Sequence, residues 1–226
     1  MKKASALAML ALLGSSVTNA QDSDPKKFRL GLQLCPNMGW IATDEKGFES
    51  DGSRLGFRFG LLGDIQLGSN ANYFFSTGLF LNNVGSKTKT TIAALDSIEA
   101  FTTKRENKYQ YVELPVSVKL KTNEIGYMTY CGLIGFDVGV LTSSKTKVEG
   151  EDFEDGNDFA YPLRVALAVG GGLEYNFSGN TSAILGLKYS NGFTSVSKDK
   201  TTVDGVEYEL PKAKLHYFEV TVGALF

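Results

Sequence analysis

Apolar residues recur at every second position over long stretches of the chain. In the first stretch the even positions from Phe28 to Leu34 are all apolar, and the positions between them carry Arg29, Gly31 and Gln33. Because successive side chains of a β-strand point to opposite faces, this period predicts a strand with one apolar and one polar face. Stretches of this kind cover 28–35, 54–67, 73–81, 111–120, 128–140, 164–175, 183–190 and 217–226.

The connections between these predicted strands alternate in length. Short turns are expected at 68–72, 122–124 and 176–180, and long polar connections at 36–53, 85–107, 142–159 and 192–211. Short turns on one side and long loops on the other are typical of barrels that cross an outer membrane. The sequence therefore predicts an all-β fold: an eight-stranded antiparallel up-and-down transmembrane β-barrel with both termini on the short-turn, periplasmic side.

Alternation alone leaves open whether the apolar face points outward to lipid or inward to a ligand, as in a soluble lipocalin-like periplasmic barrel. The polar face is rich in small residues and carries single charges of both signs: Arg29, Arg58, Lys119, Arg164 and Lys188 against Asp64, Glu113, Asp137, Glu174 and Glu219. A narrow closed interior can pair such charges. The apolar face has aromatic residues at the short-turn ends of strands, which suits an interfacial girdle: Phe28, Tyr73, Phe75, Tyr175 and Phe226. Both features favour an outer-membrane barrel with its apolar face outward.

Both ends of the chain carry features of an exported barrel. Lys2 and Lys3 precede an apolar run at 4–13, and small residues end at Ala20, so residues 1–20 are predicted to be a signal peptide cleaved after Ala20. Residues 21–226 then form the barrel domain. The last strand alternates up to Phe226, which resembles the C-terminal signature by which outer-membrane barrels are recognised for assembly. The expected partners are therefore outer-membrane lipid and, through Phe226, the barrel assembly machinery.

Three segments resemble the PorT-like outer-membrane β-barrel family of Gram-negative bacteria. The segment 109–121 has an aromatic residue and a glutamate before Leu114 and Pro115, as in the fourth strand of that family, and 170–175 and 187–193 resemble its sixth and seventh strands. The resemblance spans most of 28–226 and implies the barrel fold and an outer-membrane location. Some members are linked to protein secretion, which implies an envelope protein as a partner.

Composition and cysteine content narrow the remaining classes. The chain is 42% hydrophobic, and its net charge of −2 gives no electrostatic case for a nucleic-acid partner. Cys35 and Cys131 are the only cysteines, and they fall on strands that a closed barrel places opposite each other. They are therefore expected to be separate free thiols.

No catalytic, cofactor-binding or metal-binding residue is predicted. His216 is the only histidine, which excludes a multi-histidine metal site. By parity it faces lipid near the extracellular end, but Phe218 stands where lipid-modifying barrel esterases have a serine. Glu113 or Glu174 facing Arg58 or Arg164 is expected to form structural ion pairs rather than an acid–base pair, and glycines 170–172 to be small interior residues. A lipid-modifying enzyme remains the second alternative, after the soluble ligand-binding barrel.

The loops are the expected site of function. An open pore is disfavoured because side chains fill the interior of eight strands. The stretch 91–101 is apolar and is expected either to extend its neighbouring strands or to contact a protein, and 203–206 reads as a hairpin turn through which the seventh and eighth strands project beyond the membrane. A third connection is acidic and is predicted to be solvated rather than a calcium site: Glu149, Glu151, Asp152, Glu154, Asp155 and Asp158. The leading hypothesis is a non-enzymatic outer-membrane barrel acting through its loops or within an envelope assembly.

Overall fold

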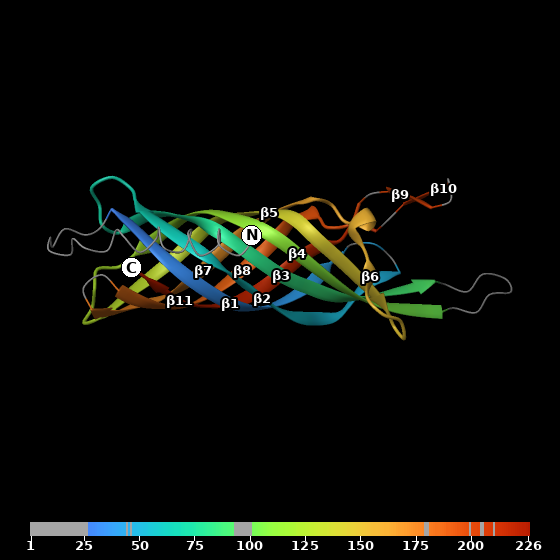
Figure 1. Cartoon of the computed structure of the whole chain (residues 1–226), viewed down its shortest axis with the longest axis horizontal. Coiled ribbons are helices and arrows are strands. Elements are labelled where there is room, and N and C mark those ends of the chain that lie inside the picture. The colour runs from blue at the N-terminus through green and yellow to red at the C-terminus, as the bar shows by residue number, and fades with distance from the viewer. Residues whose placement is uncertain are drawn as a thin grey trace, which may run out of the picture.

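A computed structural model describes residues 27–43, 45, 47–92, 101–178, 181–198, 200–203, 206–209 and 211–226. The predicted signal peptide lies outside the described residues. Eight long strands form a closed barrel (Figure 1): β1 (Phe28–Ala42), β2 (Phe48–Gln66), β3 (Tyr73–Ile92), β4 (Phe101–Lys121), β5 (Met128–Val148), β7 (Leu163–Ser178), β8 (Thr181–Ser195) and β11 (Lys214–Leu225). Each pairs antiparallel with its neighbours in sequence, and β11 pairs with β1 to close the ring. The eight-stranded up-and-down fold is confirmed.

Smaller elements lie at one end of the barrel (Figure 1). They are β6 (Glu154–Asp155), the 3₁₀ turn η1 (Asn157–Phe159), and the hairpin of β9 (Lys200–Val203) and β10 (Val206–Glu209). The chain ends at the opposite end, where the connections are short. Since outer-membrane barrels keep their short turns in the periplasm, the end with β6, β9 and β10 is the extracellular one. Within the part of the chain that the structure describes, no helix is long and apolar enough to cross a membrane.

The apolar face of the strands points outward. Leu32, Leu55 and Leu187 expose 56%, 76% and 66% of their surface, whereas the acidic side chains Asp64 and Glu113 are fully buried inside. A soluble barrel would hide the leucines and expose the carboxylates. The outward assignment is therefore confirmed, and the lipocalin-like alternative with an apolar interior is wrong.

Aromatic side chains mark both rims of this apolar belt. At the short-turn rim Phe28, Tyr73 and Phe226 are exposed, as the girdle prediction requires, and Phe75 and Tyr175 are partly exposed. The opposite rim carries a second aromatic group on β1, β8 and β11, formed by Trp40, Tyr189, His216 and Phe218.

His216 lies in that second group, on the outer face that parity predicts. Its ring stacks on Trp40 and Tyr189 with centroids 6.0 and 6.3 Å away, and its Nδ1 is hydrogen-bonded to the Tyr189 hydroxyl at 3.1 Å. These neighbours cover the imidazole, which is 8% exposed. His216 is thus part of an interfacial aromatic cluster rather than an isolated side chain facing lipid.

The long polar loops were predicted too long. Strands β3 and β4 continue through most of 85–107 and stay paired up to Ile92 and Phe101, while 93–100 lies outside the described residues. Likewise, within the predicted loop 36–53, β1 runs on to Ala42 and β2 already begins at Phe48, and β5 runs to Val148. Above the apolar belt both faces of a strand meet polar surroundings, so these segments lack the alternation that marks a half-buried strand.

The fourth long connection and the second short turn also differ from their predicted structure. Residues 203 and 206 do pair, which confirms the predicted hairpin, although 204–205 lie outside the described residues. The hairpin is a separate two-stranded sheet and not a projection of the seventh and eighth strands, because β8 ends at Ser195 and β11 begins only at Lys214. The second short turn is longer than predicted and runs to Tyr127, with Gly126 at a positive φ of 67°.

Candidate functional site

The extracellular half of the lumen holds a network of buried charges centred on Glu113 of β4. Its carboxylate pairs with Arg58 of β2 at 3.1 Å and with Arg164 of β7 at 3.3 Å. Asn82 and the Tyr217 hydroxyl donate to the same carboxylate at 2.9 and 3.3 Å. The predicted structural pairing of Glu113 with Arg58 and Arg164 is confirmed.

The same network extends to β5, β8 and β11. Lys188 pairs with Asp137 at 2.9 Å and with Glu219 at 3.3 Å, and Glu219 also pairs with Arg58 at 3.2 Å. Three cations and three carboxylates therefore neutralise one another: Arg58, Arg164 and Lys188 with Glu113, Asp137 and Glu219. A balanced, hydrogen-bonded set is the arrangement that makes buried charge tolerable.

A second network lies nearer the short-turn end. Lys119 bridges Asp64 and Glu174 at 2.8 and 2.6 Å, and Lys121 and Arg29 each reach Glu174 at 2.9 Å. The expectation that Glu174 faces Arg58 or Arg164 is wrong. Alternation tells which face a residue occupies but not its height in the barrel, and the stagger of the strands places Glu174 level with the lysines of β4.

A cavity of about 80 Å³ lies in the lumen, lined by residues of both networks and by small side chains. It has room for several water molecules. Gly170 and Gly172 line it, in agreement with their prediction as small interior residues, and Gly186 lines it as well. Gly171, predicted with them, also borders the cavity but is exposed. Cys131 also lines it, while Cys35 is buried on β1, the strand opposite β5 in the ring. Both cysteines are free, as expected.

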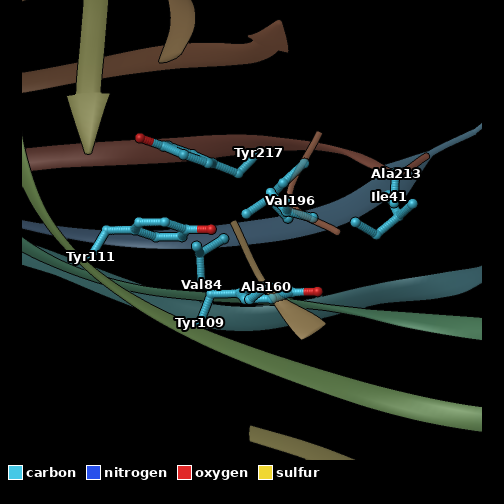
Figure 2. Close-up of a cluster of buried hydrophobic side chains, with 9 residues drawn as sticks. Ile41, Val84, Tyr109, Tyr111, Ala160, Val196, Ala213 and Tyr217 are labelled. Carbon is cyan, nitrogen blue, oxygen red and sulfur yellow. The ribbon is translucent and has the colours of Figure 1, made fainter. Parts of the chain in front are cut away.

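The extracellular mouth is closed by a cluster of buried apolar side chains, here called the plug (Figure 2). Barrel strands contribute six of its members and the connections three: Ile41, Val84, Tyr109, Tyr111, Leu215 and Tyr217, with Ala160, Val196 and Ala213. The connections are held by backbone hydrogen bonds: Tyr161 N–H donates to the Val196 carbonyl at 2.9 Å, and Val196 N–H to the Ala213 carbonyl at 2.7 Å. Sequence analysis missed the plug, because single small residues in irregular segments leave no periodic signal.

The plug and the buried charge networks together close the lumen. A water-filled channel would expose the side chains along its wall, yet Tyr111, Tyr217 and Glu113 are fully buried and Arg164 is 1% exposed. Apart from the cavity of about 80 Å³, the interior is therefore filled by side chains, as expected for eight strands. This leaves the outer surface and the extracellular end as the places where the protein can meet other molecules.

At the extracellular end β2, β3, β4 and β5 run past the apolar belt as one paired wall, here called the projecting sheet, which is made of 48–54, 83–92, 101–110 and 141–148. Beyond the plug residues Val84 and Tyr109, its inner side carries polar side chains bonded across strands: Asn107 donates to Thr88 at 3.2 Å and accepts from Thr146 at 3.1 Å. Asn157 of η1 accepts from the Ser144 N–H at 2.6 Å and ties the following connection to it. These bonds make the projection an ordered continuation of the barrel.

The outer side of the projecting sheet carries most of its charges. Arg54 donates to Glu106 at 2.6 Å, and this hydrogen bond holds the pKa of the Glu106 carboxyl below its usual value. Lys89 pairs with Glu49 at 3.0 Å, which raises the pKa of Lys89, and Lys104 lies 3.6 Å from Asp51. The remaining lysines of this side have no carboxylate within ion-pair distance among the described residues.

The acidic connection after β5 does not gather its carboxylates. Among the described residues no group of three or more histidine, cysteine, aspartate or glutamate side chains is close enough to hold a metal ion. Asp155 accepts a hydrogen bond from the Asn157 N–H at 3.0 Å, and the other acidic side chains are exposed. The arrangement is that of a solvated acidic loop.

A closed barrel with a lipid-exposed apolar belt, aromatic rims and a charged interior defines an integral outer-membrane β-barrel protein. The sequence also matches a family described as "Outer membrane protein beta-barrel domain" over residues 19–162, and the chain belongs to that family. Among curated protein sequences, none matches the chain significantly.

Several solved outer-membrane barrels have a similar fold. Neisserial surface protein A is 12% identical over 88% of this chain and 96% of its own, with a TM-score of 0.46. The attachment invasion locus protein Ail of Yersinia pestis is 17% identical over 89% and 100%, with a TM-score of 0.40, and OprG of Pseudomonas aeruginosa is 11% identical over 88% and 93%, also at 0.40. The assignment rests on the family match and on the geometry described above.

Proposed function

We propose that this protein is a non-enzymatic outer-membrane anchor that presents its projecting sheet to a partner of the cell envelope. One observation carries the proposal: the lumen is sealed at its mouth and at its charged centre, while one wall of the barrel continues outward as an ordered sheet. A filled barrel passes no solute, so the part that can act is the part outside the membrane.

A non-enzymatic role is supported by the state of the candidate catalytic groups. Glu113, Asp137 and Glu219 are held in ion pairs inside the lumen, away from any substrate that could approach. His216 is stacked among aromatic rings, and its hydrogen-bond partner is Tyr189 rather than a serine. No observation favours a lipid-modifying enzyme.

The finer assignments are part of the same proposal. The likeness of 109–121 to the fourth strand of PorT-like barrels supports an envelope partner, and secretion is the process it suggests. The N-terminal pattern supports export with cleavage after Ala20. The alternating last strand ending at Phe226 supports recognition by the barrel assembly machinery.

The test is a shortened barrel in which residues 87–106 are replaced by a two-residue Asn-Gly turn joining β3 to β4 below the projection. We expect this variant to reach the outer membrane and to retain heat-modifiable migration in gels, while it fails to complement a strain that lacks the protein. As a matched control, residues 200–209 are replaced by a short linker, which removes the β9–β10 hairpin and should leave complementation intact. Full complementation by this variant, which lacks the outer part of β3 and β4 in the projecting sheet, would overturn the proposal.

A further inference from the structure

Five cationic side chains gather on the outer side of the projecting sheet, and we call this surface the basic face: Arg54, Lys87, Lys108, Lys145 and Lys147. Strand register places the four lysines together, and Arg54 joins them through its hydrogen bond to Glu106. Lys108 stands directly opposite Lys145, and Glu106 stands between Lys87 and Lys147 in one row across three strands. Alternate residues of the same strands, such as Ser86 and Ser144, are buried on the inner side.

The four lysines of the basic face form no ion pair among the described residues, although the ring that packs on two of them, Phe153, belongs to the acidic connection after β5. The one carboxylate of the basic face, Glu106, is hydrogen-bonded to Arg54. Asp155 is opposite Lys145 in register, but its carboxylate accepts from the Asn157 N–H and forms no ion pair with the lysine. Like charges directly opposite each other on a sheet are destabilising, so a bound anion would reduce the repulsion between Lys108 and Lys145.

An aromatic ring holds two of these ammonium groups near each other. The Nζ of Lys108 is 3.3 Å from the centroid of Phe153, and the Nζ of Lys147 is 5.7 Å from it. The partial desolvation of Lys108 and the nearby charge of Arg54 lower the pKa of its ammonium group. A phosphate group is the kind of anion that such a cluster of donors neutralises.

The height of the basic face above the lipid-facing residues indicates which molecule would carry the phosphate group. Lys108 precedes Val112, the top of the lipid-facing row on β4, by four residues, and Lys145 follows Val140 of β5 by five. At the rise of a strand, four residues span about 13 Å, or about 10 Å of height at the usual tilt of such barrels. The outer side of a barrel wall faces sideways into the surrounding lipid, so its continuation at this height faces lipid headgroups rather than a molecule docking from above.

We propose that the basic face binds the phosphate groups of anionic glycolipids in the outer leaflet of the outer membrane. Arg54, Lys108, Lys145 and Lys147 would hold the phosphates, and Phe153 would pack beneath the two central ammonium groups. On the cytoplasmic side of membranes, clusters of four or more cations beside a membrane span indicate binding of anionic headgroups, and the same electrostatic attraction would act on phosphates of the outer leaflet. The interaction would also favour one rotation of the barrel about its axis, since the five cations lie on one wall.

The experiment uses the full mature barrel in uncharged detergent, titrated with lipid A that carries two phosphates, and native mass spectrometry counts the bound lipid. The variant Lys108→Gln, Lys145→Gln, Lys147→Gln should bind at least about tenfold more weakly, given roughly a factor of five per lysine near an anionic surface. The matched control Lys198→Gln, Lys212→Gln, Lys214→Gln removes the same charge from the extracellular end of β8 and β11. It should bind like the unchanged protein. Retained heat-modifiable migration shows that each variant is folded.

Two further arms separate the sources of phosphate. Lipid A stripped of its phosphates should not bind, and excess inorganic phosphate should not displace the intact lipid. Equal binding by the two triple variants would overturn the proposal, as would undiminished binding of the stripped lipid. Displacement by inorganic phosphate, or by a soluble sulfated polysaccharide at equal charge, would instead show a site for free anions and would equally overturn it.

Discussion

At the residue scale, Glu113 holds the upper lumen together. It accepts from four side chains, and it is the one carboxylate within ion-pair distance of Arg164 among the described residues. Such a residue contributes less by attraction than by preventing an unpaired charge, because a buried guanidinium without a partner loses both water and counter-charge. The sequence predicted this pairing from parity, since both residues sit on the polar face of strands.

Replacing Glu113 with glutamine should therefore lower the free energy of unfolding by about 3–5 kcal/mol. The measurement is a urea titration of the barrel in lipid vesicles, with heat-modifiable migration as the readout of the folded form. The control is Glu49→Gln, which breaks the solvent-exposed pair with Lys89 and should leave the free energy of unfolding nearly unchanged. Similar losses for the two variants would mean that the lumen tolerates an unpaired guanidinium.

Outside the membrane, the pair of Arg54 and Glu106 makes a prediction about pH. The hydrogen bond from Arg54 lowers the pKa of Glu106 in the folded protein. The pair therefore stabilises the fold fully above the ordinary carboxyl pKa, and this stabilisation is lost as the pH falls through the lowered pKa of Glu106. Arg54→Gln should raise the pKa of Glu106 toward its ordinary value. Carbon-13 NMR of the labelled carboxyl, recorded during an acid titration, measures the change. An unchanged titration in the variant would show that Arg54 does not hold this carboxylate in solution.

At the element scale, the sequence predicted the strands inside the membrane and missed their ends outside it. Between Leu114 and Leu120 every second residue must face lipid, so the chain shows strict alternation. Between Lys104 and Lys108 both sides are polar, and nothing in the pattern separates a strand from a loop. The plug was beyond prediction for a related reason: Ala160 and Ala213 are buried only because connections far apart in sequence meet over the mouth.

Glycines of the inner face allow neighbouring strands to approach closely, and Gly60 is the sharpest case. A Cβ added there would collide with the backbone of β3 at Leu79 and Phe80. Gly60→Ala should therefore cost about 1–3 kcal/mol of unfolding free energy, since the backbone must shift. Gly132→Ala is the control, because its added methyl group would meet no atom within 4 Å. Equal midpoints of unfolding in urea for these two variants would contradict the close approach of β2 and β3.

At the scale of the whole molecule, the barrel combines a stable interior with an asymmetric exterior. The charged networks and the plug fill the lumen, and one wall of four strands rises above the membrane, while the strands of the opposite wall end near the rim with the separate β9–β10 hairpin beyond them (Figure 1). A protein that passes solutes would instead need a lumen that side chains leave open. This distribution of ordered structure supports the proposed role of a membrane anchor that presents the projecting sheet.

The sealed lumen predicts that the protein does not conduct ions in a planar lipid bilayer. Because the plug and the Glu113 network close the lumen at different heights, weakening one of them should leave the other in place. The variant Tyr111→Ala, Leu215→Ala removes two large side chains of the plug and should remain closed, since Arg58, Glu113 and Arg164 lie beneath it. Stepwise currents from the unchanged barrel would contradict the sealed interior itself. Currents from the plug variant alone would show that the ion pairs open to water once the plug is gone, and would place the seal in the plug.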